Sequence, residues 1–517
     1  MSKIKILWAD DEIDMLRPHI LFLQEKGYDV DAVNSGDEAL DLINENNYDI
    51  IFLDEQMPGL SGIETLERMK NDFPNMPIVM ITKSEEESIM ESAIGSNIAD
   101  YLIKPVKPSQ ILLSLKRNLE NRKLAGEKAT MNYQQQFRDI GMKLSGRLDF
   151  EEWVDIYKKL VRYELDLEKS NDEGIIEVLN MQKNEANNAF TKFYEKNYLD
   201  WLQGNSNSRP TMSHTLIKDK VFPELQSREK VFLLLIDNLR FDQWKAIQPM
   251  IEQYFRVQKD DIYYSILPTT TQYARNALFA GLMPSEIRKY FPNFWTDEHE
   301  EGTKNQYEGK LLLEQLKRYG KNIKTSYNKI LNLNAGRKLF ENISNLMSND
   351  FNVIVYNFVD MLSHARTEME IIRELADDEP AYRSLMMSWF EHSSLFEIIK
   401  YLSEKNVKLI ITTDHGSIKV MNPVKIVGDR NVNTNLRYKF GRALSYNSRE
   451  VFEMREPEKY YLPKINVSTS YVFARSGDFF AYPNNYNYYV NYYKNTFQHG
   501  GISMEEVLIP FITLSSR

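Results

Sequence analysis

Short, mostly apolar runs that end in an acidic residue recur in the second half of this chain. The runs are 231–236, 353–359 and 409–413, and the acids that end them are Asp237, Asp360 and Asp414. Such a run is typical of a buried parallel strand, and open α/β sheets bind their ligands at the C-terminal edge of these strands. Three carboxylates at one edge repel one another, and bound cations offset that repulsion. The pattern therefore predicts a cation site at this edge.

The first 124 residues alternate apolar runs with amphipathic segments. The predicted strands are 4–9, 29–33, 50–53, 78–81 and 101–103. The predicted helices lie near 13–26, 36–46, 61–72, 84–96 and 108–124. Repeated strand–helix alternation of this kind predicts a flavodoxin-like (βα)5 domain built on a doubly wound parallel sheet.

Between about 107 and 204 the pattern changes to long polar segments with apolar residues three or four positions apart. Asp149 and Glu152 resemble a capping box that opens a helix, and a second helix is predicted to end near 204. The apolar stripe of the first helix is predicted to pack in a core rather than to bind a ligand. Because the segment has no basic recognition helix, a helix-turn-helix output is disfavoured. With the last helix of the first domain extended past 124, we predict a small helical bundle over 125–206.

The chain has 517 residues, which suits about three domains, and we place them at 1–124, 125–206 and 207–517. The polar, breaker-rich stretch 204–210 marks the second boundary, and the third domain is again predicted to be α/β.

A net charge of −10 gives no global basic field, so a phosphate ester would bind through metal or a few arginines. There are no cysteines, so any zinc would be held by histidine and carboxylate. With no signal peptide and no membrane insertion predicted, we expect a soluble, cytoplasmic protein.

Acidic, hydroxyl and basic residues follow the strands predicted in the first domain. They are Asp10 and Asp11 after the first strand, Asp54 after the third, Thr82 after the fourth and Lys104 after the fifth. Three carboxylates at one edge can hold Mg²⁺ through their oxygens, and a carboxylate beside that ion can accept a phosphoryl group. A hydroxyl and an ammonium can then bind the phosphoryl oxygens.

This set resembles the receiver domain of two-component response regulators over about the first 124 residues. The resemblance implies that Asp54 is the phosphorylated residue. It implies that Mg²⁺ is held by Asp10, Asp11, Asp54 and the backbone carbonyl of Gln56. It also implies that the phosphoryl group is sensed by Thr82, Tyr101 and Lys104.

Four further pieces, all in the last domain, carry ligand chemistry. Three threonines behind Pro268 open a helix-forming segment, where their oxygens favour a bound anion or simply cap the helix. Asp360 and His364 stand four positions apart, which places them on one face of a helical turn and suits metal chelation. Two ligand types and a glycine follow a strand at 414–416, and His499 precedes two glycines. Each piece is common when it occurs alone.

The order of these pieces resembles the alkaline phosphatase superfamily, and most closely its PglZ branch, over about 213–517. In that family two zinc ions flank a Ser or Thr that attacks phosphorus. The resemblance assigns one zinc to Asp360, His364 and His499. It assigns the other to Asp237, Asp414, His415 and the nucleophile. The family's nucleophile lies ten positions before the Gly of a Gly-Leu-x-Pro turn, here Gly281, which favours Thr271 over Thr269 and Thr270.

Arg275 and Asn276, one turn after Thr271, are predicted to contact the non-bridging substrate oxygens, the alternative being a surface salt bridge or a cap. The arginine or third metal with which the family's monoesterases bind a terminal phosphate is not evident, so a phosphodiester substrate is favoured. Six tyrosines within 482–494 would stack on the bases of an oligonucleotide, or else form a half-buried strand and helix. The segment 425–463 is predicted to be a loop or lid.

A receiver, a helical bundle and a PglZ-type domain in this order resemble the PorX-type response regulators that act with type IX secretion and gliding. The resemblance implies a sensor histidine kinase, a homodimer on phosphorylation, and contact with a sigma factor or secretion components. The expected function is a phosphorylation-controlled, zinc-dependent phosphodiesterase of nucleotides or oligonucleotides, cyclic or linear. The alternatives are a signalling adaptor whose zinc site is structural and a monoesterase or phosphoglycerate-mutase-like enzyme.

Overall fold

A computed structural model describes most of the chain. The described residues are 4–73, 76–83, 98–168, 173–205, 208–226, 229–298, 300, 302–369, 372, 374, 376, 378–428 and 433–517, without the side chains of 109, 113, 116, 117, 119–130, 366 and 368. The chain divides into two compact units, one reaching Gln134 and the other starting at Gln135. No helix among these residues combines the length and the apolar character needed to cross a bilayer.

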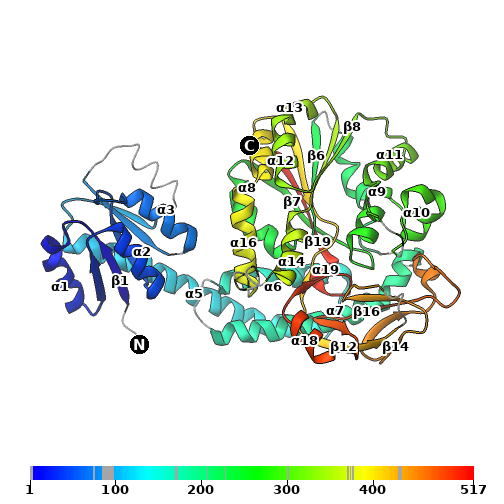
Figure 1. Ribbon diagram of the computed structural model, residues 1–517, viewed down its shortest axis with the longest axis horizontal. Helices are drawn as coiled ribbons and strands as arrows, with labels where there is room; N and C mark the ends of the chain where they lie inside the picture. Colours follow the sequence, from blue (N-terminus) through cyan, green and yellow to red (C-terminus); the bar gives the residue numbers. More distant parts are fainter. Residues whose placement is uncertain are drawn as a thin grey trace. The chain divides into compact units, whose positions relative to one another are not determined.

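The first unit is a parallel five-stranded sheet with the order β2-β1-β3-β4-β5, as predicted (Figure 1). Its strands are β1 (Lys5–Ala9), β2 (Asp29–Val33), β3 (Ile50–Asp54), β4 (Ile78–Thr82) and β5 (Asp100–Ile103). Its helices are η1 (Ile13–Leu16), α1 (Arg17–Glu25), α2 (Gly36–Glu45) and α3 (Gly62–Asp72), followed by α5 (Pro108–Leu144). The central strands β3 and β4 are buried on both faces, which explains their unbroken apolar runs. The helix predicted near 84–96 lies outside the described residues.

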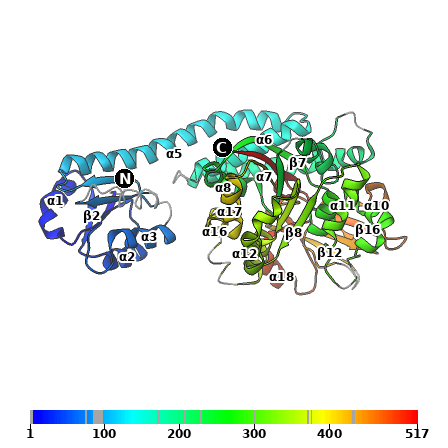
Figure 2. The same cartoon turned by 90° about the horizontal axis from the view of Figure 1, so that it is seen from above.

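The last helix predicted for the receiver continues past 124, as expected. Helix α5 is one helix of 37 residues that ends at Leu144 (Figure 2). Two further helices follow, α6 (Phe150–Leu167) and α7 (Glu173–Gln203). The capping box at the start of α6 is confirmed, because the Asp149 side chain accepts from the N–H groups of Glu151 and Glu152. The predicted stripe of α6 is buried, and Trp153 contacts Phe190 of α7 with 5.4 Å between ring centroids.

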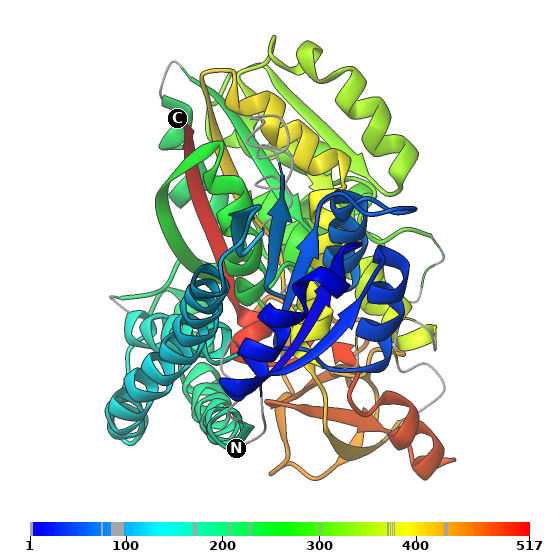
Figure 3. The same ribbon diagram turned by 90° about the vertical axis from the view of Figure 1, so that its left-hand side faces the viewer.

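A six-stranded mixed sheet with the order β7-β19-β10-β6-β9-β8 forms the centre of the second unit. Its strands are β6 (Lys230–Ile236), β7 (Phe255–Tyr264), β8 (Thr325–Ile330), β9 (Phe351–Tyr356), β10 (Val407–Thr412) and β19 (Leu508–Ser516). Strands β10, β6 and β9 are parallel neighbours, so their C-terminal ends share one edge. Strand β19 returns antiparallel between β10 and β7 (Figure 3). The three acids predicted to meet at one edge therefore follow three adjacent strands.

Helices lie on both sides of this sheet, with α8 and α16 on one side and α9 and α11 on the other (Figures 1 and 2). The α-helices that the structure describes after α7 are α8 (Phe241–Glu252), α9 (Asn276–Ala280), α10 (Pro284–Tyr290), α11 (Glu308–Arg318), α12 (Leu333–Glu341), α13 (Ile343–Leu346), α14 (Phe358–Glu368), α16 (Glu379–Glu391), α17 (Ser394–Ser403), α18 (Tyr486–Tyr493) and α19 (Met504–Val507). Short helical turns also occur at η2 (Ile217–Val221), η3 (Glu224–Gln226), η4 (Thr271–Arg275), η5 (Pro292–Phe294) and η6 (Pro457–Tyr460).

The segment predicted as a loop or lid, 425–463, is folded where the structure describes it. It belongs to a group of small sheets whose strands are β11 (Ile418–Lys419), β12 (Asn422–Val427), β13 (Tyr438–Gly441), β14 (Ser445–Tyr446), β15 (Val451–Met454), β16 (Ser470–Ala474), β17 (Asp478–Ala481) and β18 (Phe497–Gln498). The loop prediction was wrong for these strands, because they are short and share a core with residues distant in sequence, such as Ile426 with Val472. A short strand of this kind leaves little periodicity to detect.

Candidate functional site

The receiver unit brings its predicted acids together at the C-terminal ends of β1 and β3. One carboxylate oxygen from each of Asp10, Asp11 and Asp54 lies within 4.8 Å of the others. Asp10 and Asp54 are buried, and the Lys104 ammonium lies 2.9 Å from Asp10 Oδ2 and 3.1 Å from Asp54 Oδ1. Three oxygen donors at this spacing fit Mg²⁺, and Asp54 Oδ2 has no hydrogen-bond partner.

Charge and burial set the protonation behaviour of this site. Burial and the neighbouring Asp10 raise the pKa of Asp54 to about 6, although Lys104 opposes the shift. Burial alone would lower the pKa of Lys104, but the two carboxylates raise it above its usual value.

The Thr82 hydroxyl donates to Glu55 Oε2 at 2.8 Å, beside the acid cluster. The remaining two predicted residues are Gln56, which is exposed, and Tyr101, which is half-buried against the core.

The effector residues come from separate elements around the sheet edge. Asp237 directly follows β6, and the Asp414-His415 pair follows β10 by one residue. Asp360 does not end a strand as predicted, because β9 stops at Tyr356 and Asp360 lies in the first turn of α14. His499 directly follows β18, and Thr271 begins the π-helical turn η4.

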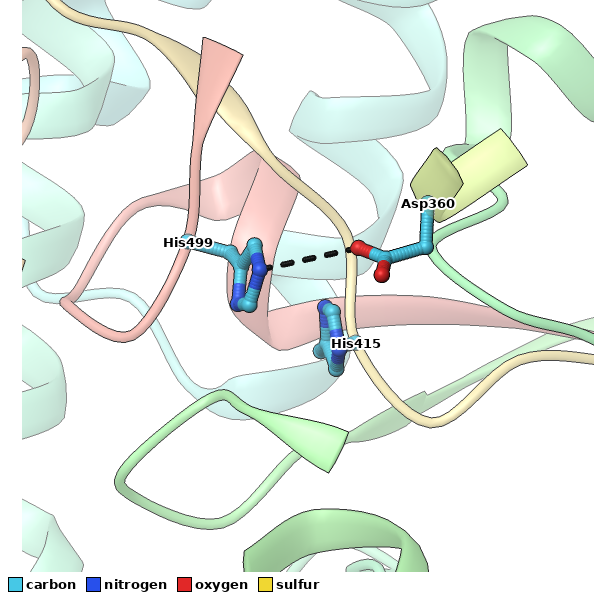
Figure 4. Close-up of side chains that lie close together, drawn as sticks. All are labelled: Asp360, His415 and His499. Atoms are coloured by element: carbon cyan, nitrogen blue, oxygen red, sulfur yellow. Dashed lines mark ion pairs between the residues drawn. The ribbon is translucent and has the colours of Figure 1, made fainter. Parts of the chain in front are cut away.

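One Asp/His cluster joins Asp360, His415 and His499, whose ligand atoms lie within 4.8 Å of one another (Figure 4). His499 Nε2 is 3.6 Å from Asp360 Oδ1, and the two imidazole rings stack with centroids 4.3 Å apart. Asn238 donates to Asp360 Oδ1 at 3.4 Å from a left-handed backbone conformation, which asparagine tolerates better than most residues. Asn238 was not assigned to the site from the sequence. Its position directly after Asp237 could have indicated that it lies at the same sheet edge.

The predicted ligand His364 lies at the margin of that cluster. Its Nε2 is 3.5 Å from Asp360 Oδ2, on the same face of α14, as the spacing of four residues requires. Its side chain is 59% exposed, and its ring centroid is 6.1 Å from that of His499. His415, which the family resemblance assigned to the other zinc, is the residue that completes the group with Asp360 and His499.

A second cluster joins Asp237, Asp414 and His415, and all three are buried. His415 Nε2 lies 3.6 Å from Asp237 Oδ1 and 3.7 Å from Asp414 Oδ2, so His415 borders both clusters. The Thr271 hydroxyl is 3.2 Å from the same nitrogen. Carboxylate and imidazole donors at these distances, with Asp237 Oδ1 lacking a hydrogen-bond partner, fit divalent metal.

The three candidate threonines differ in what their hydroxyls contact. Thr269 Oγ1 donates to the Gly501 carbonyl at 2.9 Å and accepts from the Gly500 N–H at 3.0 Å. Thr270 Oγ1 is buried without a hydrogen-bond partner. Thr271 is the one of the three whose hydroxyl contacts a candidate metal ligand. This placement favours Thr271 as the nucleophile.

The clusters alter the proton affinity of their members. Burial raises the pKa of Asp237 well above its usual value, and Asp414 and Asp360 add to the shift while Arg275 opposes it. Burial and the neighbouring His415 lower the pKa of His499 to about 3, so this imidazole is neutral and able to bind metal at neutral pH. Burial alone would raise the pKa of Asp360, but His364 and His499 hold it below its usual value.

Arg275 and Asn276 are not placed to meet substrate. Arg275 is fully buried, and its guanidinium pairs with Asp237 and with Asp414, 3.1 Å from Asp414 Oδ2. Asn276 is also buried, and its amide donates to the Gln272 carbonyl at 2.8 Å. The prediction that both contact substrate oxygens does not agree with this burial. Arg275 instead supplies the positive charge between two candidate metal ligands.

Glu308 extends this buried charge group and was not singled out from the sequence. Its Oε1 lies 3.6 Å from Arg275, and its Oε2 lies 3.2 Å from the Lys329 ammonium. Glu308 is the first residue of α11 and follows a polar stretch with other acids, so the sequence carries no signal that separates it from its neighbours.

Comparisons with known proteins divide the chain into three matches. The model of the BREX system PglZ alkaline phosphatase-like domain matches 216–514, that of the PorX response regulator linker domain 123–202, and that of the response regulator receiver domain 6–116. These matches confirm the family resemblance and the fold class predicted from the sequence.

Similar individual proteins match the receiver region. The transcriptional regulatory protein ResD of Bacillus subtilis (strain 168) is 35% identical over 115 residues, which are 22% of this chain and 48% of ResD. The alginate biosynthesis transcriptional regulatory protein AlgB of Pseudomonas putida is 34% identical over 121 residues, 23% of this chain and 27% of AlgB. The chain thus spans about half the length of these relatives or less.

Two solved structures match the same region. A CheY-like receiver domain protein of Methanospirillum hungatei JF-1 shares 26% identity and a TM-score of 0.23 over 23% of this chain and 96% of its own. The chemotaxis protein CheY4 of Vibrio cholerae shares 29% identity and a TM-score of 0.22 over 23% of this chain and 100% of its own.

Proposed function

The chain belongs to the PglZ alkaline phosphatase-like family and carries the receiver and linker of a PorX-type response regulator, and from this premise we propose that it is a zinc-dependent phosphodiesterase controlled by phosphorylation. The observation that carries the proposal is the Thr271 hydroxyl beside His415, where two Asp/His clusters meet. A hydroxyl held between two divalent cations is a nucleophile suited to phosphorus.

The residues present fit two zinc ions per effector domain. Asp360 and His499, with His415 or His364, would hold one, and Asp237, Asp414 and His415 would hold the other. The bound ions would supply positive charge for the phosphoryl oxygens and lower the proton affinity of nearby hydroxyls.

The chain's own residues would then direct the reaction. The Thr271 oxygen forms a bond to phosphorus as the bond to the leaving ester oxygen breaks, and water later cleaves the phosphothreonine. The buried Arg275 keeps the carboxylates of Asp237 and Asp414 close together despite their repulsion.

A phosphodiester fits this site better than a monoester. A terminal phosphate carries a second negative charge, which monoesterases of the superfamily meet with an arginine or a further metal. Arg275, the arginine nearest to Thr271 in sequence, is already paired with protein carboxylates. We therefore propose nucleotide-type diesters, cyclic or linear, as the substrate class.

The proposed control operates through the receiver. A sensor histidine kinase would supply the phosphoryl group to Asp54, with Mg²⁺ held by Asp10, Asp11, Asp54 and the Gln56 carbonyl. Thr82, Tyr101 and Lys104 would respond to it. The family resemblance further supports homodimerisation on phosphorylation and contact with a sigma factor or type IX secretion components.

Substitution of Asp54 by asparagine is expected to abolish phosphorylation of the receiver by a small acyl phosphate in the presence of Mg²⁺, because the amide cannot accept a phosphoryl group. Intact-mass measurement reports the added phosphoryl group. The matched control is Asp41→Asn on the exposed side of α2, which should be modified like the wild type. A phosphorylated Asp54→Asn protein would place the acceptor elsewhere.

The enzymatic proposal is tested on the purified, full-length chain. Zinc content is measured, and turnover is compared between bis-p-nitrophenyl phosphate, p-nitrophenyl phosphate and a panel of cyclic dinucleotides, with and without a chelator. We expect zinc-dependent turnover that favours the diesters. Faster cleavage of the monoester would indicate a monoesterase, and bound zinc without turnover of any ester would favour an adaptor with a structural metal site.

A further inference from the structure

The loops that carry Thr271 and His499 are held from outside the PglZ part of the chain, by helix α7. One face of α7 is buried and includes Asn187, Phe190, Thr191, Tyr194, Tyr198 and Trp201. Their spacing of three or four residues places them in one stripe. The linker match ends at 202 and the PglZ match starts at 216, so this stripe belongs to the linker.

Two tyrosines of α7 bind the backbone that leads to Thr271. The Leu267 N–H donates to the Tyr198 hydroxyl at 2.9 Å, and the Tyr194 hydroxyl donates to the Ser265 carbonyl at 2.8 Å. The two phenol rings stack with centroids 4.8 Å apart, which restricts both hydroxyls. The path of this loop into the active site is therefore defined by linker side chains.

The same helix binds the backbone that follows His499. The Asn187 amide oxygen accepts from the Met504 N–H at 2.7 Å, and its nitrogen donates to the Glu505 carboxylate at 3.0 Å. About two turns further on, Glu195 pairs with Arg475 at 2.6 Å, and the backbone of Arg475 forms a β-bridge with Ile502. Helix α7 therefore contacts both the loop that leads to Thr271 and the loop that follows His499 through polar side chains.

Thr269 joins the two loops to each other. Its hydroxyl bonds to Gly500 and Gly501, and its carbonyl lies 3.2 Å from His499 Nδ1. A movement of α7 would consequently shift Thr271 and His499 together. Misplacement of reacting groups by about 1 Å can cost about a hundredfold in rate.

Buried ion pairs connect the linker to the loop after Asp237 as well. Glu164 of α6 pairs with Lys183 of α7 at 2.6 Å and with Arg383 at 3.1 Å. Arg383 also pairs with Asp242, which pairs with Arg240 at 2.7 Å. Arg240 is three residues beyond Asp237. The carboxylates of Glu164, Asp242 and Glu379 lie close together. Lysine and arginine side chains already neutralise these acids, so the group is a structural connection rather than a metal site.

We propose that α7 is a positioning element of the active site, with Tyr198 and Asn187 as positioning residues, so that the placement of this linker helix sets the rate of the hydrolase. This inference rests on the proposed function and adds the route by which the linker controls it. Breaking the Tyr198 contact would leave the metal ligands intact but let the Thr271 loop drift from its attacking position.

The test is Tyr198→Phe in the full-length chain. We expect kcat on bis-p-nitrophenyl phosphate to fall about tenfold to a hundredfold, with KM within about twofold of the wild type and zinc content unchanged. The matched control is Tyr157→Phe, because the Tyr157 hydroxyl is buried in α6 without a hydrogen-bond partner. Its kcat should equal that of the wild type.

Hydrogen exchange gives a readout that does not depend on turnover. Leu267 loses its acceptor in Tyr198→Phe, so amide exchange in the peptide 264–275 should quicken in this variant and not in Tyr157→Phe. Unchanged exchange, or a kcat equal to that of the control, would overturn the role of α7. A wild-type protein that lacks zinc-dependent turnover would instead remove the proposed function, while exchange would still decide whether α7 holds the loop.

Discussion

Thr271→Ala is expected to lower the turnover of bis-p-nitrophenyl phosphate about a thousandfold or more while zinc content stays at the wild-type level. The reason is that alanine removes the attacking oxygen, whereas Asp237, Asp414 and His415 remain to hold the adjacent metal. Steady-state kinetics and metal analysis of the same preparation measure the two effects. Thr271→Ser should recover much of the rate, because it restores the hydroxyl.

The matched control for this substitution is Thr270→Val. It removes the hydroxyl of the preceding residue, which is buried without a partner, and keeps the side-chain volume. Its turnover should stay near that of the wild type. Full turnover in Thr271→Ala would exclude this threonine as nucleophile, and loss of zinc would show that its oxygen is needed to hold the metal. Intact signalling in a cell whose only copy is Thr271→Ala would favour the adaptor.

The location of the acids at one sheet edge was predictable because buried strands carry a strong local signal. The runs before Asp237 and Asp414 are apolar on both faces and stop abruptly, and β6 and β10 have these bounds within one or two residues. Asp360 was harder, since β9 ends at Tyr356 and α14 already begins at Phe358, inside the same apolar run. The receiver fold was predictable because apolar strands and amphipathic helices alternate along the first 124 residues.

The partners of buried charges were not predictable. Arg275 and Glu308 are 33 positions apart and meet only because α9, which directly follows Arg275, packs against α11. Nothing local distinguishes an arginine that faces substrate from one that faces protein carboxylates. The same limit applies to α7, whose tyrosines read as ordinary core residues until the loops that they bind are placed.

Arg275→Met is expected to destabilise the metal-free effector by about 3–5 kcal/mol, because it leaves the buried carboxylates of Asp237 and Asp414 without their common cation. Saturating zinc should restore part of this loss, since the metal brings positive charge to the same two carboxylates. Thermal unfolding of the effector transition, followed with a chelator and then with zinc, should therefore show a larger zinc-induced rise in Tm for the variant than for the wild type.

Arg288→Met separates this effect from the general loss of an arginine. Arg288 pairs with Asp297 at 2.8 Å but is 38% exposed, so its removal should cost at most about 1 kcal/mol and leave the zinc-induced rise in Tm unchanged. If Arg275→Met lowered Tm equally with and without zinc, the arginine would act through packing alone. If it had no effect in the chelated protein, the two carboxylates would have to share a proton instead, because two like charges buried side by side are not stable without compensation.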